Sequence, residues 1–381
     1  MNDRQPKIGL IMTGGGARAA YQVGVLRALT ELLPAEVRTP FPIICGTSAG
    51  AINAAVLAMN AGDFRRGVRR LMGVWKNFRV HHVYRADPWG AFSNSARWIY
   101  TVLTGGAFDH RPVSLLDNAP LAVLLGRQLD FPAIQRAIDA GQLSAFGITC
   151  SGYTSGQSVT FYQGVSSLQP WQRARRIGVP MPITLDHLLA SSALPFIFPP
   201  VHINREYFGD GSMRQIAPVS PALHLGADRL LVVGVGRQQQ PPPAVRVRIE
   251  THPSLAQIAG HALNSIFLDS LEVDLERLQR INRTIEMIPP ETLERSNYPL
   301  HQVEFRVITP SEELERIAVT HAGELPLTIR TLLHMVGAMR RSGANLLSYL
   351  LFERSYCRAL IRLGYQDTMA RKDELTAFLG Y

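Results

Sequence analysis

The sequence contains few cysteines and no long hydrophobic run. Its three cysteines, Cys45, Cys150 and Cys357, lie far apart and form no CxxC pair, so neither a disulfide framework nor a zinc knuckle is indicated. One short apolar run, Ile8 to Met12, lies near the N-terminus, whereas a secretory signal needs about 7–15 apolar residues and a cleavage site. No run approaches the roughly 18 apolar residues of a membrane span. We therefore expect a cytoplasmic protein without a signal peptide or a transmembrane helix.

Lysine is also scarce, because only Lys7, Lys76 and Lys372 stand among the 39 basic residues. The net charge is nevertheless +9 at pH 7, which attracts anionic surfaces such as lipid headgroups or nucleic acid. Arginines cluster at residues 65–70 and 173–176. Such clusters form a solvated face or dock on an anionic membrane, where each basic residue contributes about 1 kcal/mol. No nucleic-acid-binding motif is present, so we expect transient peripheral contact with the inner face of an anionic membrane and no nucleic-acid partner.

The first 62 residues predict two successive strand–turn–helix units. The strands are expected at Ile8–Met12 and Phe41–Cys45, and the helices from Ala17 onward and at Ala49–Asn60. Both strands are short, apolar and ended by glycine, whereas the following segments carry helix-forming residues at helical spacing. Strands that alternate with helices imply parallel pairing in an α/β sheet covered on both faces.

The rest of the chain predicts one large unit followed by a helical segment. A hairpin is expected over residues 146–162, and a buried strand at Leu230–Val235. The polar, proline-rich connector Gln238–Pro243 marks the clearest boundary. Beyond it, a long helix is predicted from Leu255 to about Arg283, and the last 60 residues are also helical in pattern. The sequence thus divides into a catalytic domain, 1–243, and a helical C-terminal segment, 244–381, expected to pack on it as a cover or assembly element.

Gly46-Thr47-Ser48-Ala49-Gly50 forms a GxSxG pattern. Alone, this pattern arises by chance in many proteins. Here it lies between a buried strand and a helix, where a sharp turn projects the serine hydroxyl above the sheet and needs small flanking residues. The helix that starts at Ala49 also brings backbone N–H groups toward developing negative charge. A serine that merely caps the helix is the structural alternative, but the context favours Ser48 as a nucleophile.

Gly14, Gly15 and Gly16 provide the second part of a candidate site. Attack on an ester carbonyl creates an oxyanion, which needs preorganised N–H donors in a water-poor site. A glycine run at a strand end lets the backbone turn its N–H groups inward. The same stretch also satisfies GxGxxA, a dinucleotide-binding fingerprint, with Glu31 or Glu36 about 20 residues further on. That alternative gives no role to Ser48.

Asp210 lies between two glycines in the sequence Tyr207-Phe208-Gly209-Asp210-Gly211-Ser212. As a bare pattern, Asp-Gly most often marks a surface turn. Together with the glycine run, the GxSxG serine and the stretch Ala190–Pro200, however, it resembles the motifs of the patatin-like phospholipases, serine lipid acyl hydrolases found in bacteria. The resemblance covers residues 7–236 well and continues more loosely through residues 274–282.

The resemblance implies a fold and a mechanism. The fold would be a three-layer α/β/α sandwich with a mainly parallel central sheet. The activity would be that of a phospholipase A or lysophospholipase, in which Ser48 works with Asp210 as its general base and without histidine. A carboxylate can serve because the proton is transferred only in the transition state, as the acyl-serine forms. No metal or organic cofactor is implied, and the sequence contains no EF-hand loop.

Several points stay open at this level. Arg18 follows the glycines and either contacts a phosphate headgroup or forms a structural pair. A Ser-Asp-His triad esterase is an alternative, because histidines follow Asp210 in the chain order of that template. These are His224, His252, His261, His301, His321 and His334. A non-catalytic lipid-binding protein on the same scaffold is a second alternative. The sequence does not determine the oligomeric state, and a homo-oligomer is one of the alternatives.

Overall fold

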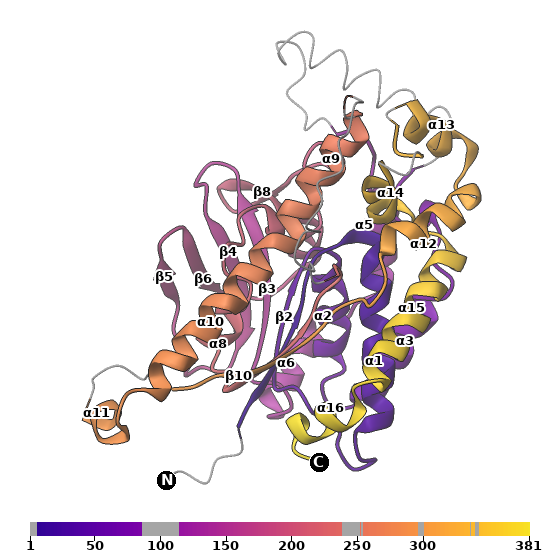
Figure 1. The fold of residues 1–381 in the computed structure, drawn as a ribbon. Helices are drawn as coiled ribbons and strands as arrows, with labels where there is room; N and C mark the ends of the chain where they lie inside the picture. Colours follow the sequence, from indigo (N-terminus) through magenta and orange to yellow (C-terminus); the bar gives the residue numbers. More distant parts are fainter. Residues whose placement is uncertain are drawn as a thin grey trace.

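The computed structural model describes residues 6–85, 114–237, 252, 254–295, 301–335, 337–339 and 343–381. Its centre is a ten-stranded sheet in the order β10-β9-β1-β2-β3-β4-β6-β5, in which β8 pairs with both β3 and β7 (Figure 1). The strands are β1 (Ile8–Met12), β2 (Ile43–Thr47), β3 (Ala145–Gly152), β4 (Ser158–Gly164), β5 (Trp171–Arg173), β6 (Arg176–Pro180), β7 (Val201–Ile203), β8 (Glu206–Asp210), β9 (Arg229–Val233) and β10 (Glu304–Ile308). The strands from β10 to β3 all pair in parallel, whereas β4, β5, β7 and β8 each make at least one antiparallel pairing.

Helices cover this mixed sheet on both faces. They are α1 (Ala20–Leu32), α2 (Ala49–Met59), α3 (Phe64–Trp75), α5 (Ala119–Gln128), α6 (Pro132–Asp139), α7 (Leu185–Ser191), α8 (Ser220–His224), α9 (Leu255–Asn264), α10 (Ser270–Glu286), α11 (Pro290–Arg295), α12 (Leu314–His321), α13 (Leu327–Met335), α14 (Ala344–Leu350), α15 (Arg354–Met369) and α16 (Lys372–Leu379). Within the described ranges, none of the helices is both long and apolar enough to cross a membrane.

The two faces of the sheet belong to two separate apolar cores. Because side chains alternate along a strand, Leu10 and Met12 of β1 point into the larger core with α1 and α2, whereas Ile11 points into the smaller one. Leu271 and Leu275 of α10 close the smaller core. Figure 1 shows α8 and α10 on one side of the sheet and α1, α2 and α15 on the other. The predicted three-layer α/β/α sandwich is therefore confirmed.

Local patterns predicted most of the elements that carry the site. Both strand–turn–helix units of the first 62 residues, the hairpin of β3 and β4, and the strand β9 lie where the sequence places them. The long helix predicted from residue 255 is interrupted by a π-helical turn at Ser265–Asp269, which separates α9 from α10. The predicted connector, residues 238–243, lies outside the described residues.

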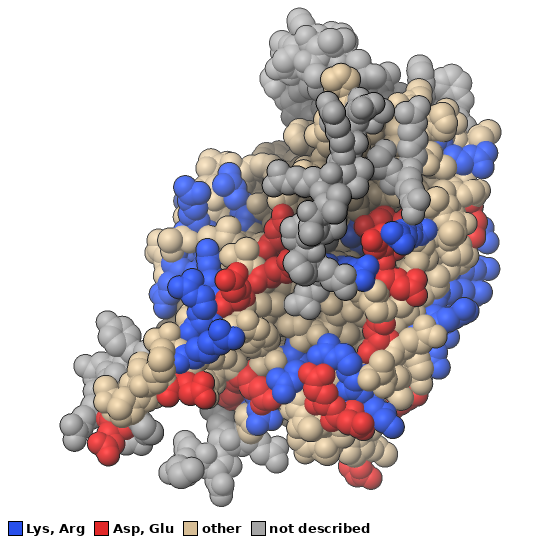
Figure 2. Space-filling view, in the orientation of Figure 1, with Lys and Arg blue, Asp and Glu red and all other residues tan. Residues whose placement is uncertain are grey.

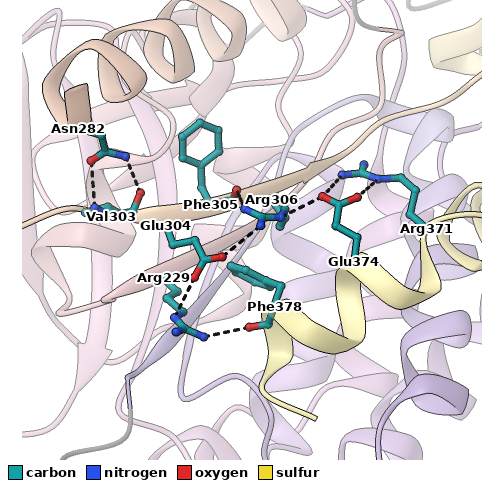
Figure 3. Close-up of polar contacts among 9 residues, drawn as sticks. All are labelled: Arg229, Asn282, Val303, Glu304, Phe305, Arg306, Arg371, Glu374 and Phe378. Carbon is teal, nitrogen blue, oxygen red and sulfur yellow. Dashed lines mark hydrogen bonds and ion pairs between the residues drawn. The ribbon is translucent and has the colours of Figure 1, made fainter. Parts of the chain in front are cut away.

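The segment after residue 244 is helical as expected, but it also supplies a strand that the sequence analysis did not predict. Strand β10 pairs in parallel with β9, with Phe305 opposite Leu230. Asn282 of α10 fixes the approach to this strand, because its side chain donates to Val303 O (2.8 Å) and accepts from Val303 N (3.0 Å) (Figure 3). The central sheet is therefore completed by the C-terminal part of the chain.

A network of charged side chains holds α16 against this edge of the sheet (Figure 3). Glu304 pairs with Arg229 and with Arg306, both at 3.2 Å. Arg306 continues to Glu374 of α16 at 2.9 Å, and Arg371 donates two further bonds to Glu374. Hydrogen bonding to Arg371 lowers the pKa of Glu374. The helix is thus joined to both strands at this edge, β9 and β10.

The C-terminal helix α15 also packs directly on α1. The two backbones approach so closely that a Cβ on Gly24 would lie 2.1 Å from Ile361 O, and one on Gly364 would lie 2.2 Å from Tyr21 O. Only glycine fits such a crossing without moving a helix. Because α1 follows the glycine loop in the chain, this crossing fixes the helix that carries the loop.

Candidate active site

Ser48 lies on the sharp turn between β2 and α2, flanked by Gly46 and Gly50. Its backbone has φ 55° and ψ −131°, a conformation that non-glycine residues rarely adopt and that marks a strained turn. The turn is held from behind, because Ser48 N donates to Ser191 Oγ (2.9 Å) and Ser191 Oγ donates to Thr149 O (2.7 Å). The strand–turn–helix placement predicted for the nucleophile is therefore present.

Asp210 ends β8, where that strand pairs with β3 opposite Cys150. Its side chain is completely buried. One carboxylate oxygen accepts a hydrogen bond from Ser212 N (2.9 Å). The other, Oδ2, is also buried, and no described residue donates to it with ordinary hydrogen-bond geometry. A buried acceptor of this kind is costly unless it has a role, and Oδ2 is therefore the atom best suited to take up a proton.

Burial raises the pKa of Asp210 to about 6. Hydrogen bonding by the Ser48 hydroxyl, and by the backbone and hydroxyl of Ser212, acts in the opposite direction but is weaker. The effect of Ser48 on this pKa agrees with a pairing of the two proposed catalytic groups. A carboxylate with a pKa near 6 is a stronger base than an ordinary aspartate and is still ionised at neutral pH.

The raised pKa predicts that the Asp210→Asn variant gains stability relative to wild type as the pH rises. The folded-state pKa lies above the unfolded value of 3.8, so wild type loses stability between pH 4 and 7 as the buried group ionises, whereas asparagine cannot ionise. Two pKa units correspond to about 3 kcal/mol. Urea unfolding of both proteins at pH 4 and pH 7 measures this difference. A stability difference that is the same at both pH values would contradict the raised pKa.

The glycine loop lies on the other side of Ser48. Gly16 and Ala49 are the first residues of their helices, so neither backbone N–H has an intrahelical acceptor. Both residues line the same cavity as Ser48. Gly14 approaches the aspartate loop, because a Cβ on Gly14 would lie 2.6 Å from Ser212 Oγ. The structure thus brings the glycine run, Ser48 and the Asp210 loop together.

Polar residues beneath the loop were not identified from the sequence. Gln22 donates to Thr13 O (2.8 Å), and Asn53 donates to Gln22 Oε1 (3.0 Å) and to Ala19 O (3.2 Å). Trp75 in turn donates to Asn53 Oδ1 (2.8 Å). Gln22 and Asn53 are completely buried. Their amides on otherwise apolar helix faces are the sequence signal that could have indicated them.

Arg18 has a structural environment. Its side chain is 2% exposed. It donates to Ser348 Oγ (2.8 Å) and Asn345 Oδ1 (3.0 Å), stacks over the Tyr349 ring and lies 3.6 Å from Glu315. Arg18 does not line the cavity at Ser48. Of the two interpretations of Arg18, the geometry favours the structural pair, because the guanidinium joins the glycine loop to α14.

An apolar cavity extends away from Ser48. The space between its walls, the open mouth included, is about 840 Å³. Its polar lining residues are Ser48, Ser192, Arg70 and Gln128, and Gly16 and Ala49 also line it. The remaining wall is mostly apolar and comes from α2, α3, α5 and the segments around residues 78, 194–198 and 352: Ile52, Val56, Leu71, Val74, Trp75, Phe78, Val83, Leu121, Leu124, Leu125, Leu129, Leu194, Phe198 and Phe352. The apolar stretches around residues 115–125 and 346–352 thus contribute to this wall.

The histidines of the triad alternative lie elsewhere. His224 stacks on Trp171, and His321 contacts Ser355 and Glu324. Within the described part of the chain, no histidine lines the cavity or affects the titration of Asp210. Glu31, one of the acids of the dinucleotide alternative, pairs with Arg27 and accepts from Tyr365. The geometry therefore favours a serine–aspartate pair.

Comparisons with known proteins agree with this geometry. A family model described as patatin-like phospholipase matches residues 10–223, a range that includes the glycine loop, Ser48 and Asp210. A stretch of 75 residues is 39% identical to lysophospholipase nte1 of Aspergillus terreus, and covers 18% of this chain and 5% of that protein.

Solved structures give a more distant likeness. The human GIVD cytosolic phospholipase A2 aligns with a TM-score of 0.46 at 11% identity, over 98% of this chain and 60% of that one. VipD from Legionella pneumophila aligns with a TM-score of 0.34 at 12% identity, over 97% and 67%. The chain thus spans about two thirds of these proteins or less, and a very small part of the lysophospholipase.

Proposed function

The chain belongs to the patatin-like phospholipase family, and from this membership we propose that it hydrolyses fatty-acyl esters through Ser48 and Asp210. The observation that supports the proposal best is that Ser48 lines a mostly apolar cavity. An acyl chain that fills this cavity would bring its ester carbonyl to the serine hydroxyl, because Ser48 forms part of the cavity wall. Oriented binding of this kind lowers the entropic part of the barrier.

In the proposed cycle, Ser48 Oγ attacks the ester carbonyl while Asp210 accepts its proton. The backbone N–H groups of the glycine loop and of Ala49 stabilise the resulting oxyanion. Protonated Asp210 then gives the proton to the departing alcohol or lysolipid, and the acyl group stays on Ser48. Asp210 then takes a proton from water, whose oxygen attacks the acyl carbonyl. The bond from that carbon to Ser48 Oγ breaks, the fatty acid leaves, and Asp210 returns the proton to Ser48 Oγ. No metal ion or organic cofactor takes part in these steps.

The substrate class we propose is a phospholipid or lysophospholipid. Among the described lining residues the charged one is Arg70, which is exposed and whose guanidinium donates to Gln128 O (2.7 Å). An aliphatic chain is the ligand that such a wall favours, at about 0.8 kcal/mol for each buried CH2 group. The polar headgroup would remain at the open mouth.

The proposal predicts that wild type hydrolyses both p-nitrophenyl esters and phosphatidylcholine vesicles. The kcat/KM for the soluble esters should increase with chain length from acetate to octanoate, because each CH2 group adds apolar contact. It should also rise with pH through about 6, as Asp210 ionises. If folded wild type cleaves none of these substrates across several lipid classes, the catalytic proposal fails and lipid binding becomes the function to test.

Phe196 supports the proposed contact with a membrane. Its side chain is 76% exposed, and its backbone has φ 64°, which is strained for an aromatic residue. Leu115 N donates to Phe196 O (2.9 Å) and holds the loop in place. The neighbouring Leu194 and Phe198 line the acyl cavity. An exposed aromatic ring beside the cavity would insert into the lipid surface from which the substrate is taken.

The arginine cluster at residues 65–70 is less available for membrane contact than its sequence predicts. Arg65 donates to Leu33 O (2.6 Å) and Pro34 O (2.9 Å), so it satisfies carbonyl groups after α1. Arg70 donates to Gln128 O at the cavity wall. Two of the arginines of this cluster are thus engaged within the protein.

We expect Phe196→Asn to reduce hydrolysis of phospholipid vesicles at least about tenfold, because burial of a phenylalanine side chain is worth roughly 1.5–3 kcal/mol. Asparagine tolerates the left-handed backbone. Hydrolysis of soluble p-nitrophenyl butyrate should be unchanged. The matched control is Ile281→Asn, an equally drastic change at a half-exposed position on α10, which should leave both rates unchanged. Equal losses on soluble and vesicle substrates would refute a membrane role for Phe196.

We also propose that residues 244–381 complete the catalytic domain rather than only covering it. The support is strand β10 at the edge of the central sheet and the close crossing of α15 on α1.

A further inference from the structure

A second hollow, which the proposed reaction does not use, lies between α15 and the loop after α3. Its lining is rich in arginine and consists of Arg79, His321, Glu324, Glu353, Arg354, Ser355, Arg358, Ala359 and Arg362. Residues 354, 358 and 362 follow one another at intervals of four along α15, so they share one face of that helix. Figure 2 shows basic side chains gathered along the right-hand edge of the molecule, where α3 and α15 lie in Figure 1.

The arginines of this hollow have no carboxylate partners within the described ranges. No ion pair joins Arg79, Arg354, Arg358 or Arg362 to an acidic residue there. Arg354 Nε is in addition buried without a hydrogen-bond partner. Buried polar groups are normally satisfied. Arg358 Nε donates to Lys76 O (3.0 Å), which leaves its other N–H groups without a protein partner among the described hydrogen bonds. An arrangement of this kind is stabilised when an anion binds between the guanidinium groups.

The two carboxylates in the lining do not neutralise the arginines. Glu324 accepts from the Ser355 hydroxyl and contacts His321 Nδ1 at 3.4 Å. The carboxylate of Glu353 accepts a hydrogen bond from Val80 N (3.4 Å). Burial raises the pKa of Glu353 above its ordinary value, although Arg79 lowers it. The positive charge of the hollow therefore exceeds the negative charge.

From this geometry we propose that the hollow is a binding site for a phosphate group, held between the guanidinium groups of Arg79, Arg354, Arg358 and Arg362. Guanidinium matches the tetrahedral phosphate oxygens through paired N–H donors. The positive end of the α15 dipole adds to the field, since Arg354 is the first residue of this 16-residue helix. The phosphate belongs either to a free phosphorylated molecule or to a phosphomonoester lipid headgroup.

The proposed site shares a wall with the acyl cavity. Phe78 and Phe352 line the cavity, whereas the next residue of each segment, Arg79 and Glu353, lines the hollow. Phe78 and Phe352 also pack edge-to-face, with ring centroids 5.7 Å apart. A bound phosphate would therefore hold the two segments that carry the aromatic part of the cavity wall.

Titration calorimetry with inorganic phosphate, at constant ionic strength set by sodium chloride, tests the site in the whole protein. Wild type should bind one phosphate, and Arg354→Gln/Arg358→Gln should bind it at least about tenfold more weakly. The matched control is Arg280→Gln/Arg283→Gln, which removes the same charge from exposed positions on α10 and should keep the wild-type affinity. No phosphate binding by wild type, or equal losses in both double variants, would overturn the proposal.

Vesicle flotation measures membrane binding and distinguishes a lipid headgroup from a free phosphorylated molecule as the source of the phosphate. All proteins in this experiment carry Ser48→Ala so that lipid is not consumed. The vesicles contain phosphatidylcholine with or without phosphatidic acid. If the headgroup is the ligand, Arg354→Gln/Arg358→Gln should abolish the preference for phosphatidic acid, and inorganic phosphate should compete. If a free phosphorylated molecule is the ligand, calorimetry shows the loss while flotation is the same for both double variants.

Discussion

Ser48→Ala is expected to lower kcat/KM for p-nitrophenyl esters at least about a thousandfold and to leave the fold intact. Loss of a serine nucleophile removes the covalent route altogether, and only catalysis by the oxyanion donors and by binding remains. The substitution should also keep the hydrogen bond that holds the turn, because the backbone N–H of residue 48, and not the serine hydroxyl, donates to Ser191 Oγ. Steady-state hydrolysis, with circular dichroism as a check on folding, measures the effect.

The matched control for this prediction is Ser192→Ala. Ser192 lines the same cavity, but its hydroxyl donates to Leu188 O (2.7 Å) within its own helix end. This variant should retain activity within a few fold. A fluorophosphonate probe should label wild type and Ser192→Ala but not Ser48→Ala, as detected by intact-protein mass spectrometry. Activity retained by Ser48→Ala would place the nucleophile elsewhere.

Asp210→Asn separates the dyad from the triad alternative in the same assay. In the proposed mechanism it removes the base and should approach the loss seen for Ser48→Ala. The expected gain in stability of Asp210→Asn over wild type at neutral pH would show that the loss of activity is not caused by misfolding. An active Asp210→Asn enzyme would favour a histidine as the base.

Gly16→Ala is expected to lower kcat about 100- to 1000-fold, the usual loss for one oxyanion donor. Gly16 has φ +54°, and a Cβ at this position would lie 2.3 Å from Tyr349 O. Because that neighbour is backbone, the glycine loop must move and its N–H groups lose their alignment. KM for a soluble ester should change much less than kcat, since the apolar residues that would hold the acyl chain are unchanged. Saturation kinetics with p-nitrophenyl butyrate separate the two constants.

Gly156→Ala is the control for Gly16→Ala. Gly156 also has a left-handed backbone, with φ +64°, but a Cβ there meets nothing within 4 Å. Its turn between β3 and β4 is remote in the chain from the glycine loop. Both variants should lose about 1 kcal/mol of stability from backbone strain. Gly16→Ala should lose more because of its contact with Tyr349 O, and only this variant should lose activity. Wild-type kcat in Gly16→Ala would show that the glycine loop does not provide the donors.

The parts of the fold that the sequence predicted are those set by short-range patterns. The strand at Ile8–Met12 is apolar throughout because both faces of the sheet are covered, and the turn at Ser48 follows from small residues between a strand and a helix. These signals lie within a few residues of one another. Asp210 had no such local signal, and it was identified only through the resemblance to a family.

Strand β10 and the environment of Arg18 depend on long-range contacts, which explains why the sequence did not reveal them. Strand β10 is a half-buried edge strand with Glu304 and Arg306 in a charged network, so it lacks the continuous apolar run of β1 and β9. Arg18 is charged but buried, because partners more than 300 residues away satisfy its guanidinium. The cavity wall likewise combines helices α2, α3 and α5 with residue 352. No local pattern indicates such combinations.

The close crossing of α1 by α15 has a consequence for how the protein is made. Ribosomes deliver the chain from its N-terminal side, so the glycine loop, Ser48 and Asp210 are all synthesised before residues 354–369. Until that helix has emerged, α1 lacks the partner on which Gly24 packs, and the loop that precedes α1 lacks the contacts of Arg18 with α14. A nascent chain therefore carries every reactive group without a finished site. We therefore expect the proposed hydrolase activity to appear only after synthesis has passed residue 369.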